Sequence, residues 1–370
     1  MTSTNDAMLN KKPSSDQIKR VPKAVLHDHL DGGLRPQTII DLAKEIGYTK
    51  LPFDDAQKLG DWFFEACNSG SLERYLETFD HTIAVMQTRE AIIRVAREAA
   101  IDLALDGVVY AEVRGAPELF TRGELDLDGV IEATTEGFQQ GMKEAAEMGH
   151  PIRVEQILCA LRQNDWSDEV ARKVVKYRDQ HVVGFDIAGP EDGFPAKNYL
   201  SAFDYLRAEN AHFTIHAGEA YGPASIWQAI QICGSERLGH GVRIVEDIDF
   251  NGAIPKLGLL AAYVRDRRIP LELCPTSNLQ TGAAKDYASH PIGVLESLRF
   301  RITINTDNRL MSGTSMSQEM EHVVDAFDWT LLDLQRVTVN ALKSAFIPFD
   351  ERLKIIEEVV KPAYLAISQE

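Results

Sequence analysis

The fold is decided by residues 91–114, AIIRVAREAAIDLALDGVVYAEVR, where a helical pattern passes directly into a strand pattern. Apolar residues in the first part recur every three or four positions, as on the buried face of a helix. That part ends at Gly107, a residue suited to the end of a helix. The β-rich run GVVYAEVR follows at once. A helix that packs on a sheet and leads into a strand is the repeating unit of a parallel α/β fold.

The same alternation continues along the whole chain. Short β-rich runs are separated by helix-patterned stretches, which predicts an α/β fold with parallel strands. Because eight strands close a (β/α)8 barrel, the predicted architecture is a TIM barrel, and an open doubly wound sheet is the alternative. The eight runs are residues 23–29, 107–114, 152–161, 181–188, 212–217, 237–241, 269–273 and 301–306.

The chain has 370 residues, whereas a (β/α)8 barrel typically needs about 250. Extra helices are expected between the first two runs, where DWFFEACNSGSLERYLETFD (61–80) has a helical pattern. Residues 331–367 predict two further helices at the C-terminus. Residues 1–20 are expected to be a disordered or loosely attached segment. Because no Gly/Ser-rich linker divides the remainder, residues 21–370 are predicted to form a single domain.

Charge and composition exclude several classes of protein. The 39 Lys and Arg residues against 56 Asp and Glu residues give a net charge of −17, which disfavours binding to nucleic acid or anionic lipid. Neither a signal peptide nor a membrane-spanning segment is visible, so a cytoplasmic location is expected. The four cysteines are far apart and form no C-x-x-C pair, which disfavours both a disulfide scaffold and a thiolate zinc site.

Polar side chains gather where predicted strands end, and a barrel of this kind builds its active site at those ends. The first run ends in His27-Asp28-His29, and the two-residue period of a strand places both histidines on one side. The fifth run ends in His216, the sixth carries His240, and Asp307 follows the eighth. Imidazoles with one carboxylate and no thiolate suit a catalytic Zn²⁺. One ion per chain is predicted, because the fourth run supplies no lysine that could be carbamylated to bridge two metals.

Two neighbouring residues carry the expected proton chemistry. A metal such as zinc lowers the pKa of water enough to give a nucleophile at neutral pH. Glu219 lies three residues beyond His216, where a carboxyl group could pass a proton to substrate, although it could instead only stabilise the start of the next helix. Asp307 could both bind the metal and accept a proton. The spacing leaves open whether His240 is a metal ligand or an unligated partner of the attacking water.

The motifs LHDHLDGGLRP, VVGFDIAG, IHAGE, RLGHG, LCPTSN and NTDN occur in this order from about Val25 onward. The series resembles that of the adenosine deaminase family, within the metal-dependent amidohydrolases. The resemblance implies zinc-dependent hydrolysis of adenosine and 2′-deoxyadenosine to inosine and 2′-deoxyinosine, with release of ammonia. The stretches YLETFD, YAEVRGAP and ILCALR are also similar to that family. The match therefore extends over nearly the whole chain.

Site roles follow from the resemblance, motif by motif. It implies that His27, His29, His216 and Asp307 bind zinc, with His29 also beside the substrate. Glu219 would donate a proton to N1 of the purine, and His240 would be the unligated partner that orients the attacking water. Asp31 would accept a hydrogen bond from the ribose 5′-hydroxyl, and the N–H of Gly189 would reach N3. Gly189 could also be an ordinary turn glycine.

One position departs from the family pattern, and one matching motif is given a structural role. Asn308 stands where the family has a second aspartate, and its amide can still donate a hydrogen bond to N7 of the purine. In the LCPTSN motif, residues 273–278, a structural role near the mouth of the barrel is expected for Cys274, Pro275, Ser277 and Asn278.

Other activities remain as alternatives. The first is deamination of a related 6-aminopurine, such as adenine or an aminofutalosine-type nucleoside; Asp31 favours a nucleoside with a free 5′-hydroxyl. Hydrolysis of a cyclic amide and a catalytically silent barrel are further possibilities, but a silent barrel would be expected to lose a ligand or the acid. The H-x-E…P-C-x-x-C signature of cytidine-type deaminases is missing. The expected partner is a small nucleoside, with neither nucleic acid nor membrane, and the oligomeric state is left open.

Overall fold

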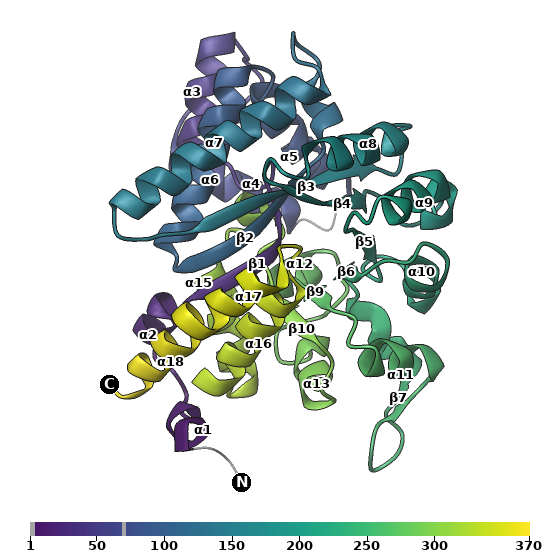
Figure 1. Ribbon diagram of the computed structural model, residues 1–370. Helices are drawn as coiled ribbons and strands as arrows, with labels where there is room; N and C mark the ends of the chain where they lie inside the picture. Colours follow the sequence, from purple (N-terminus) through teal and green to yellow (C-terminus); the bar gives the residue numbers. More distant parts are fainter. Residues whose placement is uncertain (1–3, 69–71) are drawn as a thin grey trace.

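Parallel strands form a closed barrel in the computed structural model, which describes residues 4–68 and 72–370 (Figure 1). Strands β1 to β4 pair in sequence order, and so do β5, β6, β9 and β10. The parallel bridges Phe185 to Phe213 and Asp28 to Asp307 join the two sheets at both edges. The predicted (β/α)8 barrel is therefore confirmed, with strands β1 Lys23–His29, β2 Val108–Gly115, β3 Arg153–Leu161, β4 Val182–Ala188, β5 Thr214–Ala217, β6 Arg237–His240, β9 Leu271–Leu273 and β10 Ile302–Ile304.

Helices surround the barrel because each buries one apolar face against the strands. The helices of the outer layer are α6 Arg89–Leu105, α7 Leu127–Glu147, α8 Ser167–Tyr177, α9 Leu200–Ala208, α10 Pro223–Trp227, α11 Leu259–Asp266, α13 Pro291–Ser297 and α16 Leu331–Ser344. Helix α6 begins where the Thr88 side chain accepts a hydrogen bond from the N–H of Ala91, and Gly107 follows its end with φ of 81°. This is the helix end that the sequence predicts.

Helices α6 and α7 pack closely because glycine occurs at two positions of α7 four residues apart. A Cβ atom at Gly137 would lie 2.5 Å from the carbonyl oxygen of Ile93, and one at Gly141 would lie 2.4 Å from that of Arg97. Any side chain at either position would push the two helices apart. This close packing holds α6, which precedes β2, against α7, which follows β2.

Additional helices occupy the places where the sequence predicts them. Between β1 and α6 lie α3 Pro36–Ile46, α4 Ala56–Cys67 and α5 Leu72–Val85, and residues 69–71 of the predicted helical insertion are outside the described part of the chain. After β10 come α14 Arg309–Ser312 and α15 Met316–Phe327. The C-terminal end continues as α17 Phe349–Lys354, a π-helical stretch over Ile355–Val360 and α18 Lys361–Ser368.

The N-terminal segment, expected to be disordered or loosely attached, contains helices α1 Thr4–Leu9 and α2 Ser15–Arg20. A capping box formed by Ser14 and Gln17 begins α2, and the side chains of Leu9 and Ile18 are buried. The N–H of Leu331 donates to the carbonyl oxygen of Lys11 at 3.0 Å. These contacts place the segment against the C-terminal helices, close to the C-terminus in Figure 1.

A hairpin, the cysteines and the lengths of the helices can also be compared with the sequence-based expectations. The short hairpin of β7 Ile248–Asp249 and β8 Lys256–Leu257 was not predicted, and it projects from the barrel. All four cysteines are free and buried. Among the described residues, every helix is too short or too polar to cross a membrane.

Candidate active site

The first site residues lie at the end of β1. His27 and His29 point to the same side of the strand, with ring centroids 5.3 Å apart. Asp28 faces the other way, where it accepts hydrogen bonds from Arg309 at 2.8 Å and from the Thr306 hydroxyl at 2.6 Å. The alternation of a strand thus separates the two histidine side chains from a carboxylate that makes structural contacts.

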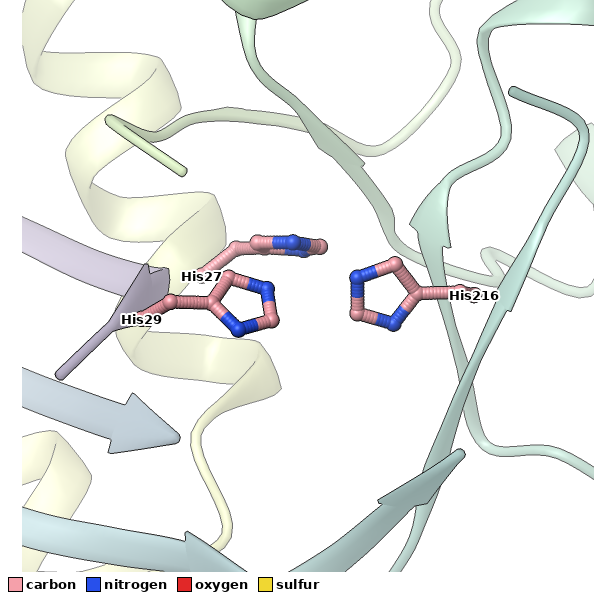
Figure 2. Close-up of side chains that lie close together, drawn as sticks. All are labelled: His27, His29 and His216. Atoms are coloured by element: carbon pink, nitrogen blue, oxygen red, sulfur yellow. The ribbon is translucent and has the colours of Figure 1, made fainter. Parts of the chain in front are cut away.

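His216, at the end of β5, approaches both histidines from the opposite side of the barrel (Figure 2). Its ring centroid lies 4.6 Å from that of His27 and 5.4 Å from that of His29. Figure 2 shows the three rings converging on one point. The barrel therefore brings together three residues that are up to 189 positions apart in the sequence.

Asp307 and His240 complete the cluster. Asp307 Oδ1 lies 3.4 Å from Nε2 of both His27 and His29, and the ring of His240 lies 4.7 Å from that of His27. Both Asp307, with φ of 57°, and His240, with φ of 61°, adopt the left-handed backbone region that ordinary residues rarely occupy. Such strained backbone is concentrated at functional sites, where it directs a side chain at a particular point.

The donor set fits a metal ion. His27, His29 and His216 each offer a nitrogen within 4.8 Å of the others, and so do the ligand atoms of His27, His240 and Asp307. Nε2 of His27 is buried and has no hydrogen-bond partner among the described residues. Burial lowers the pKa of His27 and holds that of His29 well below its usual range, which favours the neutral imidazole that binds metals.

Carboxylates behind two of the rings orient them. Glu272 Oε2 lies 3.0 Å from Nδ1 of His27, and Asp186 Oδ2 lies 2.8 Å from Nδ1 of His216, so Nε2 of each ring faces the centre. Arg114 bridges the two carboxylates, at 2.7 Å from Asp186 and 2.8 Å from Glu272. Such partners of ligating histidines fix the ring orientation and tautomer.

The pKa of both supporting carboxylates is low despite their burial. Burial opposes ionisation, but His216 and Arg114 hold the pKa of Asp186 well below its usual range, and Arg114 and Arg237 lower that of Glu272. The sequence analysis did not identify Asp186, Glu272 or Arg114. A detectable signal existed for two of them, because Asp186 and Glu272 are each the single charged residue of an otherwise apolar strand.

Glu219 lies beside His240, with Oε2 3.5 Å from Nε2 of the ring. Burial raises the pKa of Glu219. Its backbone is held by Glu191, whose carboxylate accepts the N–H groups of Gly218 at 3.2 Å, Glu219 at 2.9 Å and Ala220 at 3.3 Å. Glu219 is thus a partly exposed carboxyl group on a fixed backbone at the edge of the histidine cluster.

The LCPTSN motif supplies two further contacts, from α12 Pro275–Gln280. The hydroxyl of Ser277 donates to Asp307 Oδ2 at 2.6 Å, and Nδ2 of Asn278 lies 3.1 Å from Nδ1 of His240. The sequence analysis expected a structural role at the barrel mouth for these residues. The structure adds direct contacts with site residues, which spacing alone does not reveal.

Three residues predicted to contact substrate, Asp31, Gly189 and Asn308, follow the barrel strands β1, β4 and β10. Asp31 is buried just after β1, and its burial raises the pKa of its carboxyl group to about 6. Gly189 follows β4 with φ of 92°, and a Cβ there would lie 2.5 Å from Oε1 of Gln163. Asn308 is buried next to Asp307 and packs on Gly32, where a Cβ atom would lie only 2.0 Å from its Oδ1.

Comparison with known proteins places this architecture in a family. The family model described as "Adenosine deaminase" matches residues 22–362. The chain belongs to the adenosine deaminase family. It is 61% identical over 368 residues to adenosine deaminase 1 of Streptomyces coelicolor, an alignment that covers 99% of this chain and 93% of that protein. The predicted family resemblance is confirmed.

Solved structures share the fold at lower sequence identity. Adenine deaminase from Arthrobacter aurescens superposes with a TM-score of 0.77 at 23% identity, covering 92% of this chain and 98% of that one. An amidohydrolase from Burkholderia ambifaria, described with bound Zn, gives a TM-score of 0.78 at 21% identity, covering 100% of this chain and 95% of that one. These two proteins therefore share the barrel fold with this chain at low sequence identity.

Proposed function

We propose that this member of the adenosine deaminase family hydrolyses adenosine and 2′-deoxyadenosine to inosine and 2′-deoxyinosine, with release of ammonia. The observation that carries the proposal is the convergence of His27, His29, His216 and Asp307, with Glu219 beside His240, at the ends of the barrel strands. A buried set of imidazole nitrogen donors with an adjacent carboxyl group suits hydrolysis at an electrophilic carbon. The high identity to a protein named adenosine deaminase supports adenosine as the substrate.

One zinc ion per chain is the proposed cofactor. His27, His29, His216 and Asp307 would hold it, because their donor atoms converge and the set contains no thiolate. When bound, zinc acts as a Lewis acid that makes water a nucleophile at neutral pH. Asp186 and Glu272 contribute by keeping Nε2 of His216 and His27 directed at the centre.

The proton transfers are assigned to three side chains. Glu219, whose pKa is raised by burial, would give a proton to N1 of the purine and so make C6 more electrophilic. Asp307 would accept a proton from the attacking water, and His240 would hold that water toward C6 by a hydrogen bond. Addition of water at C6 and loss of the amino group as ammonia then give the inosine product.

Substrate contacts are assigned to the rim of the same centre. Asp31 would accept the hydrogen bond of the ribose 5′-hydroxyl, and the N–H of Gly189 would donate to N3. Asn308 would donate its amide to N7, and His29 would lie beside the bound purine. The proposed contact of Gly189 is made by the backbone. The positive φ of Gly189 and the closeness of the Gln163 side chain both disfavour a larger residue at this position.

Deamination of adenine or an aminofutalosine-type nucleoside is the alternative function. The buried carboxylate of Asp31 favours a nucleoside, because burial without a ligand hydroxyl would leave an ionised group poorly solvated. The acidic chain favours an uncharged small substrate over nucleic acid or a membrane surface, and a cytoplasmic location stays a prediction.

An ammonia-release assay over adenosine, 2′-deoxyadenosine, adenine, AMP and aminofutalosine tests the proposal. We expect kcat/KM to be highest for the first two substrates. An equal or higher kcat/KM for adenine would overturn the role assigned to Asp31, and absence of ammonia release from both nucleosides would overturn the proposed function.

A further inference from the structure

A chain of hydrogen bonds leads from the backbone of α13 to the ring of His240. The N–H of Ile292 lies 3.0 Å from Nδ1 of His290, Nε2 of His290 lies 3.2 Å from Oδ1 of Asn278, and Nδ2 of Asn278 lies 3.1 Å from Nδ1 of His240. His290 and Asn278 are buried, as is His240. The chain therefore consists of three side chains shielded from water and one fixed backbone donor.

The direction of every bond in this chain follows from the backbone end. A backbone N–H can only donate, so Nδ1 of His290 is an acceptor and carries no proton. Burial lowers the pKa of His290 to about 4, which keeps the ring neutral with its proton on Nε2. That N–H donates to Oδ1 of Asn278, which leaves the amide NH₂ facing His240. Nδ1 of His240 must accept, and the ring proton of a neutral His240 is on Nε2.

We propose that His290 and Asn278 are positioning residues that fix the ring proton of His240 on Nε2. This inference rests on the proposed function only for its effect on turnover. Nε2 of His240 lies 3.5 Å from Glu219 and 4.0 Å from Asp307, so the fixed proton is presented to the reacting centre. A protonated Nε2 offers no lone pair, which makes His240 a hydrogen-bond donor and removes it from the candidate metal ligands.

The partners of Nδ1 explain how three of the four clustered histidines, His27, His216 and His240, divide into two roles. Nδ1 of His27 and of His216 faces a carboxylate, which accepts the ring proton and leaves Nε2 free to bind a metal. Nδ1 of His240 faces an amide NH₂ group, which has the opposite effect. The question that the sequence leaves open, ligand or unligated partner, is decided by the residue behind the ring.

Substitution of Asn278 by aspartate tests the inference, because a carboxylate would accept the proton of Nδ1 and reverse the tautomer of His240. Long-range ¹⁵N–¹H spectra of [¹⁵N]histidine-labelled, zinc-loaded protein report the tautomer, with the signals of His240 assigned by their loss in His240→Gln. We expect Nε2–H in the wild type and Nδ1–H in Asn278→Asp. A wild-type ring protonated on Nδ1 would overturn the inference, whether or not the protein deaminates adenosine.

Steady-state kinetics of the same variants provide a second test. A reversed tautomer typically costs on the order of 10³ to 10⁴ in kcat at a site where the ring acts directly, so we expect a loss of at least about 100-fold with KM nearly unchanged. In the His240→Gln background, Asn278→Asp should cause no further loss, because it acts through that ring. An additive loss in the double variant, or wild-type kcat in Asn278→Asp, would contradict the inference.

His290→Leu keeps the test decisive if the aspartate variant fails to fold. It removes the donor to Oδ1 of Asn278, so the amide can turn and the spectrum of His240 should show both tautomers with a lower kcat. The side chain of His290 also caps the start of α13, so loss of a helix cap needs its own control. Asp126→Ala is that control, because it removes the side chain that accepts the N–H of Gly129 at the start of α7. The control should lose similar thermal stability with unchanged kcat. A single Nε2–H tautomer and wild-type kcat in His290→Leu would contradict the inference.

Discussion

At the scale of single residues, the site pairs one raised carboxyl pKa with one depressed carboxyl pKa. Burial raises the pKa of Glu219, whereas His27 holds that of Asp307 well below its usual range against the effect of its own burial. Two carboxyl groups whose pKa values are shifted in opposite directions suit proton donation by one and acceptance by the other. The proposed function therefore gives the acid role to Glu219 and the base role to Asp307.

Glu219→Gln tests the acid role. The amide keeps the volume but cannot donate a proton to N1, so we expect kcat for adenosine to fall by about 10² to 10⁴. Zinc content should match the wild type, because Glu219 is not in the proposed ligand set. Glu246→Gln, a change at an exposed glutamate in the 3-10 helix Val242–Asp247 after β6, is the control and should leave kcat unchanged. Wild-type turnover in Glu219→Gln would contradict the role.

Asp31→Ala tests the contact with ribose. Loss of a hydrogen bond to a charged acceptor typically costs roughly 1.5 to 3 kcal/mol, so kcat/KM for adenosine should fall about 10- to 100-fold. The rate with adenine, which has no 5′-hydroxyl, should change little. An equal loss for both substrates, measured by ammonia release, would show that Asp31 acts on the base or on the fold.

The sequence predicts those residues whose signal is local. His27 and His29 alternate along one strand, and His216 with Glu219 shares one short motif, so pattern and motif suffice. Ser277 contacts Asp307 across 30 residues and Asn278 contacts His240 across 38, which no spacing rule predicts. These contacts exist only because closure of the barrel brings β6, α12 and β10 to one end.

At the scale of elements, the strands could be placed from their apolar β-rich runs. The run at 23–29 coincides with β1, whereas the run at 301–306 shortens to the three residues of β10 because its end turns into the site at Asp307. The β7–β8 hairpin was missed since each strand has only two residues, too few for an alternating pattern. Asp307 therefore lies just beyond the end of β10.

Helix α15 supports the site helix α12 through a buried carboxyl group. Glu319 accepts the N–H of Thr276 at 3.0 Å and the hydroxyl of Thr314 at 2.7 Å, and burial raises its pKa to about 7. In the unfolded chain the pKa is near its ordinary value of about 4.3. Between these two values the folded state binds the proton and the unfolded state does not, so stability falls as pH rises through this range.

Glu319→Gln should remove this pH dependence. The amide group imitates the neutral carboxyl, with Oε1 accepting from Thr276 and Nε2 donating to Thr314. From urea unfolding at pH 5 and pH 8, we expect the wild type to lose up to roughly 3 kcal/mol more stability than the variant between the two values. Glu65→Gln, at an exposed position, is the control and should behave as the wild type. Equal losses in wild type and Glu319→Gln would contradict the assignment.

At the scale of the whole molecule, the closed barrel is what makes one site from distant residues. Strands β1, β5, β6 and β10 contribute the cluster, and a buried network of Arg114, Asp186 and Glu272 holds its imidazoles from within the barrel. Three of the 56 acidic residues, Asp31, Glu219 and Asp307, are assigned to the proposed site. We expect the net charge of −17 to disfavour polyanionic partners.

The most direct test of the account is ammonia release from adenosine before and after removal of zinc. We predict that the purified protein holds one zinc per chain, that chelation abolishes release of ammonia, and that added zinc restores it together with inosine formation in equal amount. Full activity in protein that metal analysis shows to be free of zinc would contradict the account.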